Sequence, residues 1–221
     1  MLAKVYSSGL LGIEAYPIEI EVDISGGLPA VTLVGMADTC IRESRERVKS
    51  AIKNSGFSWP QGRITVSLAP SNIKKEGACF DLAIALGILL ASQQLNSQII
   101  ADCCLVGELS LDGLLRPVQG ILPISIALAK SKIRKNILLP WQNAKEAAFA
   151  RDVFVRPLKT LSEAVEFLNN PQIIEPFKLD IESLFKQNSG YNVDFSEVKG
   201  QYFAKRAIEV AVAGRHNILM L

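Results

Sequence analysis

Hydrophobic and polar residues alternate along the first part of the chain. In the segment EAYPIEIEVDISGG, residues 14–27, acidic side chains occupy one face. The apolar positions of this segment share the other face: Ile18, Ile20, Val22 and Ile24. A period of two is typical of a half-buried antiparallel strand. Residues 2–12 and 29–36 form similar runs that break at glycine, so the first 35 residues are predicted to form strands.

The period changes at Asp38. Residues 38–56 repeat their apolar positions at helical spacing, with Asp38 as the expected N-cap and Gly56 as the expected stop. The apolar stripe of this predicted helix consists of Ile41, Val48 and Ile52. Glu43 and Arg47 are four residues apart and are predicted to form an ion pair on its surface.

The middle of the chain alternates strands and helices. We predict a strand at 63–70, a central helix at 81–95 that is apolar on most sides, and a hairpin over 101–118 that turns at Asp112-Gly113. Further predicted elements are a helix at 119–132, a strand at 136–140, a helix at 143–150, a strand at 152–155 and a helix at 160–168. This order predicts an α/β (α+β) fold in which a mixed sheet is covered by helices.

The last part of the chain has a different character. Prolines, paired asparagines and the NSG triplet interrupt residues 169–195, which we interpret as a linker. Residues 196–221 then read as a helix and a short apolar strand, HNILML. The inward positions expected for this helix are Ala204, Ile208, Ala211 and Val212. We therefore divide the chain into 1–168, a linker at 169–195 and 196–221.

Composition narrows the class of protein. Of the 221 residues, 49% are hydrophobic and 21% are charged, which is typical of a globular protein. A net charge of +2 does not by itself indicate a nucleic-acid binder. The longest apolar run, residues 80–92, is shorter than the roughly 20 residues that cross a bilayer. We expect a cytoplasmic protein without a membrane segment or a signal peptide.

The sequence does not indicate a metal site or a redox-active cysteine pair. The four cysteines, Cys40, Cys79, Cys103 and Cys104, contain no C-x-x-C spacing, and His216 is the single histidine. Adjacent strand residues point to opposite faces, so Cys103 and Cys104 are not expected to bind one metal ion. We predict no metal site, and we interpret the cysteines as reduced structural residues.

Two segments carry a resemblance to a known enzyme fold. Residues 66–91, VSLAPSNIKKEGACFDLAIALGILLA, and residues 105–123, LVGELSLDGLLRPVQGILP, resemble the proteolytic domain of Lon-type proteases. The resemblance covers residues 1–168 and implies the fold of the second domain of small-subunit ribosomal protein five. The position of the catalytic serine falls on Cys79, and that of the catalytic lysine falls on Leu122.

The resemblance therefore implies a protease scaffold without its catalytic dyad. A thiol needs a base or a lowered pKa to become a nucleophile, and Leu122 provides neither. The alternative is a Lon-like peptidase that uses Cys79 as its nucleophile.

The C-terminal segment resembles the entrance of an AAA+ ATPase module. In that family the V-x-G-Q turn, here Val198, Lys199, Gly200 and Gln201, lies against the adenine. The following strand leads to a phosphate-binding loop, G-x-x-G-x-G-K-[ST], which this sequence does not contain. We expect the chain to be an N-terminal fragment of a longer protein, and the alternative is a complete protein whose last strand pairs at a sheet edge.

Together these segments resemble the YifB/ComM family of magnesium-chelatase-like AAA+ ATPases. The resemblance implies a bacterial ATPase that uses ATP and magnesium, assembles into a hexameric ring and acts on DNA. Its expected roles are recombination and branch migration during natural transformation, the state called competence. On this interpretation the fragment is not an enzyme by itself and binds neither ATP nor magnesium. A metal-chelatase-type ATPase subunit is a further alternative.

Clusters of basic residues are the candidates for DNA contact, because phosphate binding needs clustered cations. The candidate residues are Arg42, Arg45, Arg47, Lys49, Lys53, Lys74 and Lys75. A second basic cluster consists of Lys130, Lys132, Arg134 and Lys135. No aromatic residues interleave with these cations along the sequence, and the alternative role of the basic residues is ordinary solvated charge or subunit contact.

Overall fold

The computed structural model describes residues 1–131, 134–180 and 194–220. The chain forms two compact units, Met1–Leu179 and Asp180–Leu221, each of which is described by itself. The first unit extends past the expected boundary at residue 168. The reason is that the segment after the helix Leu161–Asn169 packs against the first unit. The Phe177 N–H donates to the Val155 carbonyl at 2.8 Å, and Ile174 packs on the core.

A four-stranded sheet forms one half of the first unit. Its strands lie in the order β1-β2-β4-β3, with antiparallel pairing except between β3 and β4, which are parallel. Their bounds are β1 Leu2–Leu11, β2 Glu14–Ser25, β3 Ala30–Val34 and β4 Arg63–Ala69. The alternation predicted for β2 is confirmed, since Ile18, Ile20 and Val22 are fully buried and Ile24 is half-buried.

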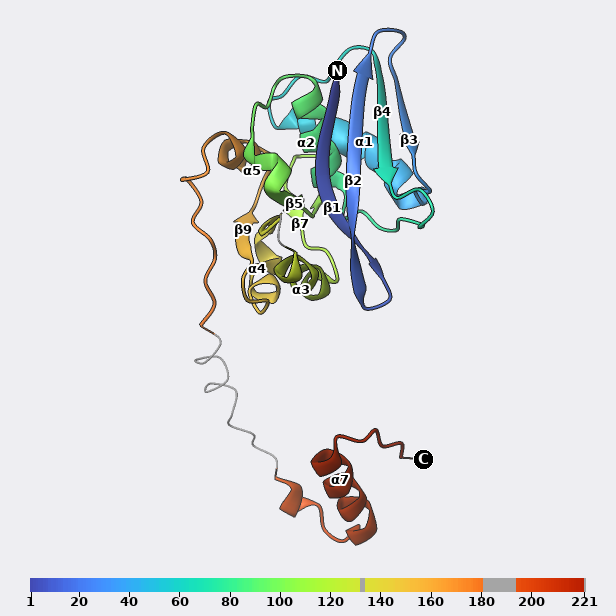
Figure 1. The fold of residues 1–221 in the computed structure, drawn as a ribbon, viewed down its shortest axis with the longest axis vertical. Helices are drawn as coiled ribbons and strands as arrows, with labels where there is room; N and C mark the ends of the chain where they lie inside the picture. The colour runs from blue at the N-terminus through green and yellow to red at the C-terminus, as the bar shows by residue number, and fades with distance from the viewer. Residues whose placement is uncertain (132–133, 181–193, 221) are drawn as a thin grey trace. The chain divides into compact units, whose positions relative to one another are not determined.

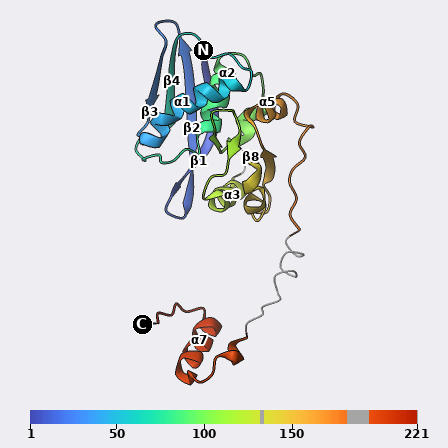
Figure 2. The same ribbon diagram turned by 180° about the vertical axis from the view of Figure 1, so that it is seen from behind.

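Two helices cover one face of this sheet, α1 (Thr39–Asn54) and α2 (Asp81–Ala91), as both views show (Figures 1 and 2). The predicted N-cap of α1 is confirmed, because the Asp38 carboxylate accepts the Ile41 N–H at 2.8 Å. The predicted stop is also confirmed: α1 ends at Asn54, and Gly56 has a φ of 85°. Helix α2 is buried on all sides and forms the centre of the domain, as its sequence predicts.

A smaller parallel sheet forms the other half. It consists of β5 (Cys103–Leu105), β8 (Asn136–Pro140) and β9 (Phe154–Leu158), in the order β5-β8-β9. The helices of this half are α3 Ile121–Lys130, α4 Ala144–Ala147 and α5 Leu161–Asn169. The two halves meet where the Ser7 hydroxyl of β1 donates to the Leu105 carbonyl of β5 at 2.7 Å.

The hairpin predicted over residues 101–118 is correct at its turn but too long. Only β6 (Glu108–Leu109) and β7 (Leu115–Arg116) pair across the Asp112-Gly113 turn. The residues before them, Cys103–Leu105, pair with β8 instead, because a buried parallel partner is available there. The prediction that Cys103 and Cys104 face opposite sides is confirmed, since they belong to two different hydrophobic clusters.

The second unit contains a 3₁₀ turn, Phe195–Glu197, and helix α7 (Tyr202–Gly214). Of its four expected inward positions only Ala211 is buried, and Val212 is 73% exposed. The strand predicted at the end of the chain is wrong for the described residues 216–220, which have no regular structure. A strand needs a neighbouring strand for its backbone hydrogen bonds, and the described residues of this unit provide none. Leu221 lies outside the described residues.

Candidate functional site

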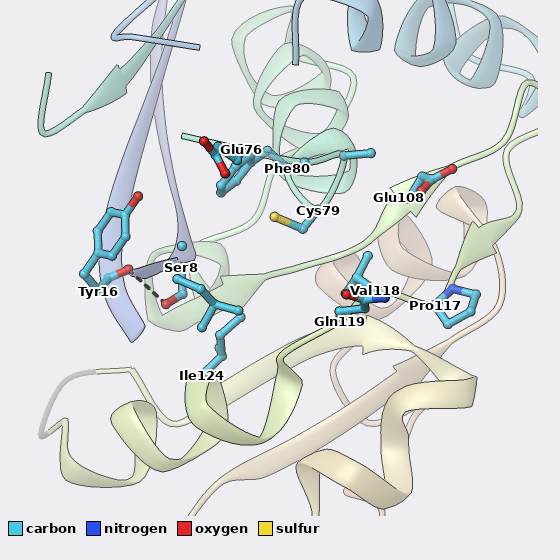
Figure 3. Close-up of a pocket in the computed structure, with 14 residues that line it drawn as sticks. Ser8, Tyr16, Glu76, Cys79, Phe80, Glu108, Pro117, Val118, Gln119 and Ile124 are labelled. Atoms are coloured by element: carbon cyan, nitrogen blue, oxygen red, sulfur yellow. Dashed lines mark hydrogen bonds between the residues drawn. The ribbon is translucent and has the colours of Figure 1, made fainter. Parts of the chain in front are cut away.

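A pocket of the first unit lies where the resemblance to Lon proteases places a catalytic site. Its volume is about 530 Å³, and it opens between β1–β2, the entrance of α2 and the start of α3 (Figure 3). It is lined by Ser8, Gly9, Leu10, Tyr16, Glu76, Gly77, Ala78, Cys79, Phe80, Glu108, Pro117, Val118, Gln119 and Ile124. The resemblance singled out Cys79 in the sequence, and in the structure Cys79 lines this pocket.

Cys79 is fixed at the entrance of α2 by backbone hydrogen bonds. Its carbonyl accepts the Gly107 N–H at 2.8 Å, and the Gly107 carbonyl accepts the Leu82 N–H at 3.1 Å. In Figure 3 the Cys79 sulfur points toward the side of the pocket that Ser8 and Tyr16 line. The scaffold therefore presents the Cys79 side chain into the pocket, at the position that the sequence resemblance matches to the catalytic serine of Lon proteases.

The chemistry of this pocket does not activate a thiol. Burial, reinforced by the negative charge of Asp81, raises the pKa of the Cys79 thiol to about 12. Among the described residues, no lysine, arginine or histidine lines the pocket, and its other ionisable side chains are Tyr16, Glu76 and Glu108. Burial also raises the pKa of Tyr16. Near neutral pH the Cys79 sulfur therefore stays protonated, and the pocket supplies no cation to stabilise a thiolate.

The other dyad position, Leu122, does not line the pocket. It lies in the first turn of α3, where its N–H donates to the Glu146 carboxylate at 2.9 Å. An aliphatic side chain there can neither take nor give a proton.

Two lysines precede Cys79 in sequence but do not line the pocket. Lys75 is fully buried, and its ammonium donates to the Pro70 carbonyl. Burial lowers the pKa of Lys75. Lys74 is exposed and pairs with Glu76, with 2.7 Å between its nitrogen and the carboxylate oxygen. Of these two DNA candidates, only Lys74 offers its charge to solvent.

Arg47 also turns away from solvent. Its guanidinium binds the buried Asp81 carboxylate through two hydrogen bonds, at 2.9 and 3.2 Å, and donates to the Cys40 carbonyl at 3.3 Å. The predicted surface pair between Glu43 and Arg47 is wrong, because the buried carboxylate on α2 takes the guanidinium instead. Arg47 is thus committed to an internal contact rather than to phosphate.

The remaining cations of α1 form a stripe on its outer face: Arg42, Arg45, Lys49 and Lys53. Their spacing of three, four and four residues places them one above another on a helix. Arg42, Arg45 and Lys53 are exposed and Lys49 is half-buried. Arg45 pairs with Glu46 at 3.0 Å. We call these four residues the α1 stripe. A cleft beside the stripe is also lined by Trp59, which lies beyond the predicted helix that carries these cations.

The second basic cluster is partly engaged in contacts. The Arg134 guanidinium carbon lies 3.4 Å from the centre of the Tyr6 ring, and Arg134 Nε donates to the Ala101 carbonyl at 3.2 Å. Lys130 is exposed and Lys135 is half-buried. Lys132 lies outside the described residues.

The turn assigned to the adenine, Val198–Gln201, is exposed over all four residues. Gly200 and Gln201 both have positive φ values, 70° and 51°, and the turn leads directly into α7. In the part of the chain that the structure describes, no three histidine, cysteine or acidic residues gather as metal ligands would. Within the same residues, every helix is too short or too polar to span a bilayer.

Comparison with protein families gives two matches. The family described as "Subunit ChlI of Mg-chelatase" matches residues 20–143, more than half of the chain. The family described as "Magnesium chelatase, subunit ChlI" matches residues 194–221. The first match contains Cys79 and the α1 stripe, and the second contains the turn before α7.

Several individual proteins are similar along most or all of the chain. Competence protein ComM of Haemophilus influenzae is 41% identical over 100% of this chain and 43% of its own length. YifB of Escherichia coli is 38% identical over 100% of this chain and 42% of its own length. Lon protease 2 of Bacillus subtilis is 25% identical over 74% of this chain and 32% of its own length. The chain thus spans less than half the length of ComM and YifB.

Proposed function

We propose, since this chain belongs to the magnesium-chelatase ChlI family and to its YifB/ComM group, that residues 1–179 are a non-proteolytic accessory domain of a motor driven by ATP. The motor acts on DNA in this proposal, and one relative is named as a competence protein, ComM. Its role is recombination and branch migration during the uptake of DNA, and its setting is the cytoplasm.

The observation that carries the accessory role is the chemistry around Cys79. The pocket lies where the resemblance implies a Lon active site, but its thiol has a pKa of about 12, and among the described residues no cation lines it. A fold that keeps the pocket without an activated nucleophile supports a scaffold rather than a peptidase.

The observation that supports DNA contact is the α1 stripe. Its four cations face outward along one side of a helix, and the fifth candidate of α1, Arg47, is bound to Asp81. From Arg42 to Lys53 the stripe spans about 16 Å at 1.5 Å per residue. A line of outward cations of this length suits the phosphates of one DNA strand.

The second unit belongs to the ATPase in this proposal. Val198–Gln201 contact the adenine of ATP, and magnesium binds with the nucleotide in the rest of the module. The assembly is a hexameric ring. The match of residues 194–221 to a ChlI family supports this assignment.

The experiment compares the 221-residue chain with the longer gene product that we expect. We expect the chain alone to hydrolyse no ATP, and the longer protein to hydrolyse ATP with stimulation by DNA. We also expect the chain to bind DNA with an affinity that falls steeply with salt, measured by fluorescence anisotropy at 50 and 200 mM salt. A chain that binds no DNA at low salt would remove DNA contact from the accessory domain.

A second candidate is a metal-chelatase-type subunit, which the descriptions of both matching families favour. The two candidates predict different dependences of ATP hydrolysis. A DNA motor is stimulated by DNA alone, whereas a chelatase subunit needs its metal-inserting partner proteins and is indifferent to DNA.

A further inference from the structure

A small cleft lies beside the α1 stripe, between α1 and the start of β3. Its volume is about 190 Å³. It is lined by Pro29, Ala30, Val31, Arg45, Glu46, Lys49 and Trp59. This volume is below the range of pockets that enclose drug-sized ligands, and it suits a single flat ring better than a larger molecule.

Trp59 is held firmly at this cleft. The residue is half-buried and packs against the main hydrophobic cluster. The preceding residue, Ser58, is fixed on both sides: its N–H donates to the Gln94 side-chain oxygen at 2.8 Å, and the Gln94 amide donates to its carbonyl at 2.7 Å. The indole is therefore a preorganised surface, which loses little conformational freedom when a ligand stacks on it.

Cations flank the indole. Arg45 and Lys49 are one helical turn apart and both line the cleft. Lys49 forms no ion pair within the described part of the chain. Among the described residues, the carboxylate that lines the cleft is that of Glu46, which binds Arg45 at 3.0 Å. Glu46 is largely exposed, so an incoming anion can displace it from Arg45 at low cost.

We propose that this cleft binds an unpaired base of a DNA strand, stacked on Trp59, while the adjacent phosphates bind Arg45 and Lys49. This inference rests on the DNA contact in the proposed function and deepens it to single-stranded DNA. An aromatic face beside cations is the arrangement by which proteins bind single strands without sequence preference. The bases of a duplex are stacked inside the helix and do not reach such a cleft.

The chain contains two tryptophans, so Trp59 can be made its own reporter. In a Trp141→Phe variant of the 221-residue chain, oligo(dT) is expected to quench the fluorescence of Trp59. A blunt-ended duplex with the same number of phosphates is expected to leave this fluorescence unchanged. Quenching of equal size by both DNAs would overturn the proposal.

Variants separate stacking from charge. Trp59→Leu is expected to weaken the binding of labelled oligo(dT) about tenfold or more, whereas Trp59→Phe, which keeps an aromatic face, stays within about threefold. Glu46→Gln frees Arg45 and is expected to tighten binding several-fold; it leaves the core untouched, so its result does not depend on whether Trp59→Leu folds. Unchanged affinity in both Trp59→Leu and Glu46→Gln would overturn the proposal.

The outcomes also separate this proposal from the broader one. Salt-dependent DNA binding without quenching of Trp59 contradicts the cleft and keeps DNA contact by the α1 stripe. No DNA binding at 50 mM salt contradicts both.

Discussion

The Arg47 guanidinium on α1 binds the Asp81 carboxylate at the start of α2, with 2.9 Å between Nε and Oδ2. Asp81 is buried, and its Oδ2 also accepts the Leu109 N–H at 3.3 Å. One carboxylate, two residues after the pocket-lining Cys79, thus joins α1, α2 and β6. The fixed position of the α2 entrance depends on this ion pair.

Replacing Arg47 by methionine is expected to destabilise the first unit by about 3–5 kcal/mol at pH 7.5, because Asp81 would remain buried without its partner. The measurement is urea-induced unfolding. The matched control is Arg45→Met on the exposed face of the same helix, which is expected to change stability by less than about 0.5 kcal/mol. Equal effects of the two variants would contradict this account of Arg47.

Asp81 predicts a pH dependence of stability. Burial raises its pKa to about 6 in the folded chain, against about 4 in an unfolded chain. Between these values the folded state binds the proton more tightly, so this contribution to stability is present below pH 4 and is lost as the pH rises through 6. Its size is on the order of 3 kcal/mol.

The difference in unfolding free energy between the wild type and Asp81→Asn measures this contribution from pH 4 to 7. The wild type is expected to lose stability relative to Asp81→Asn as the pH rises, since asparagine does not titrate. A difference that is constant with pH would show that Asp81 has the same pKa in both states.

Cys79 is expected to react slowly with thiol reagents. A thiol with a pKa of about 12 carries about three orders of magnitude less thiolate near neutral pH than an ordinary cysteine. After brief alkylation at pH 7.5, peptide mapping should find Cys79 unmodified in the native chain. In the urea-unfolded chain the same treatment should modify Cys79. Fast labelling together with peptide cleavage that Cys79→Ala abolishes would restore the peptidase alternative.

The α1 stripe predicts a change in the salt dependence of DNA binding. Lys53→Gln or Arg42→Gln is expected to reduce the slope of log affinity against log salt by about one, because each cation replaces counterions on one phosphate. The control is Lys145→Gln, an equal loss of charge at an exposed position on α4. If Lys145→Gln changes the slope as much as Lys53→Gln does, the DNA contact is not specific to α1.

Gly87 in the middle of α2 is a site where local preference and packing oppose each other. A Cβ at this position would lie 2.8 Å from Val22 Cγ2 of β2. Alanine is the better helix former by about 1 kcal/mol, but overpacking costs about 1–3 kcal/mol, so Gly87→Ala is expected to be destabilising. In a Val22→Ala background, which provides the space, thermal unfolding should show that the same change costs less or stabilises.

Much of the secondary structure could be read from the sequence, because it depends on neighbours along the chain. The alternation in β2, the cap at Asp38 and the Asp112-Gly113 turn are local signals, and all three are confirmed. The pairing of Cys103–Leu105 was not readable, because a strand gains its partner from wherever the fold brings one. Resemblance to Lon proteases located Cys79 and Leu122, but it could not give the pKa of the thiol, which burial sets.

The sequence by itself determined the family and the candidate cations, which lie on the predicted helix at 38–56 and at Lys74 and Lys75. Only the tertiary structure decided which of those cations face solvent. Lys75 is buried and Arg47 is bound to Asp81, whereas Arg45 and Lys49 lie beside Trp59 at a shared cleft. The physical reason is that residues distant in sequence decide whether a side chain is buried and which charged group it binds. The order of residues along the chain does not contain this information.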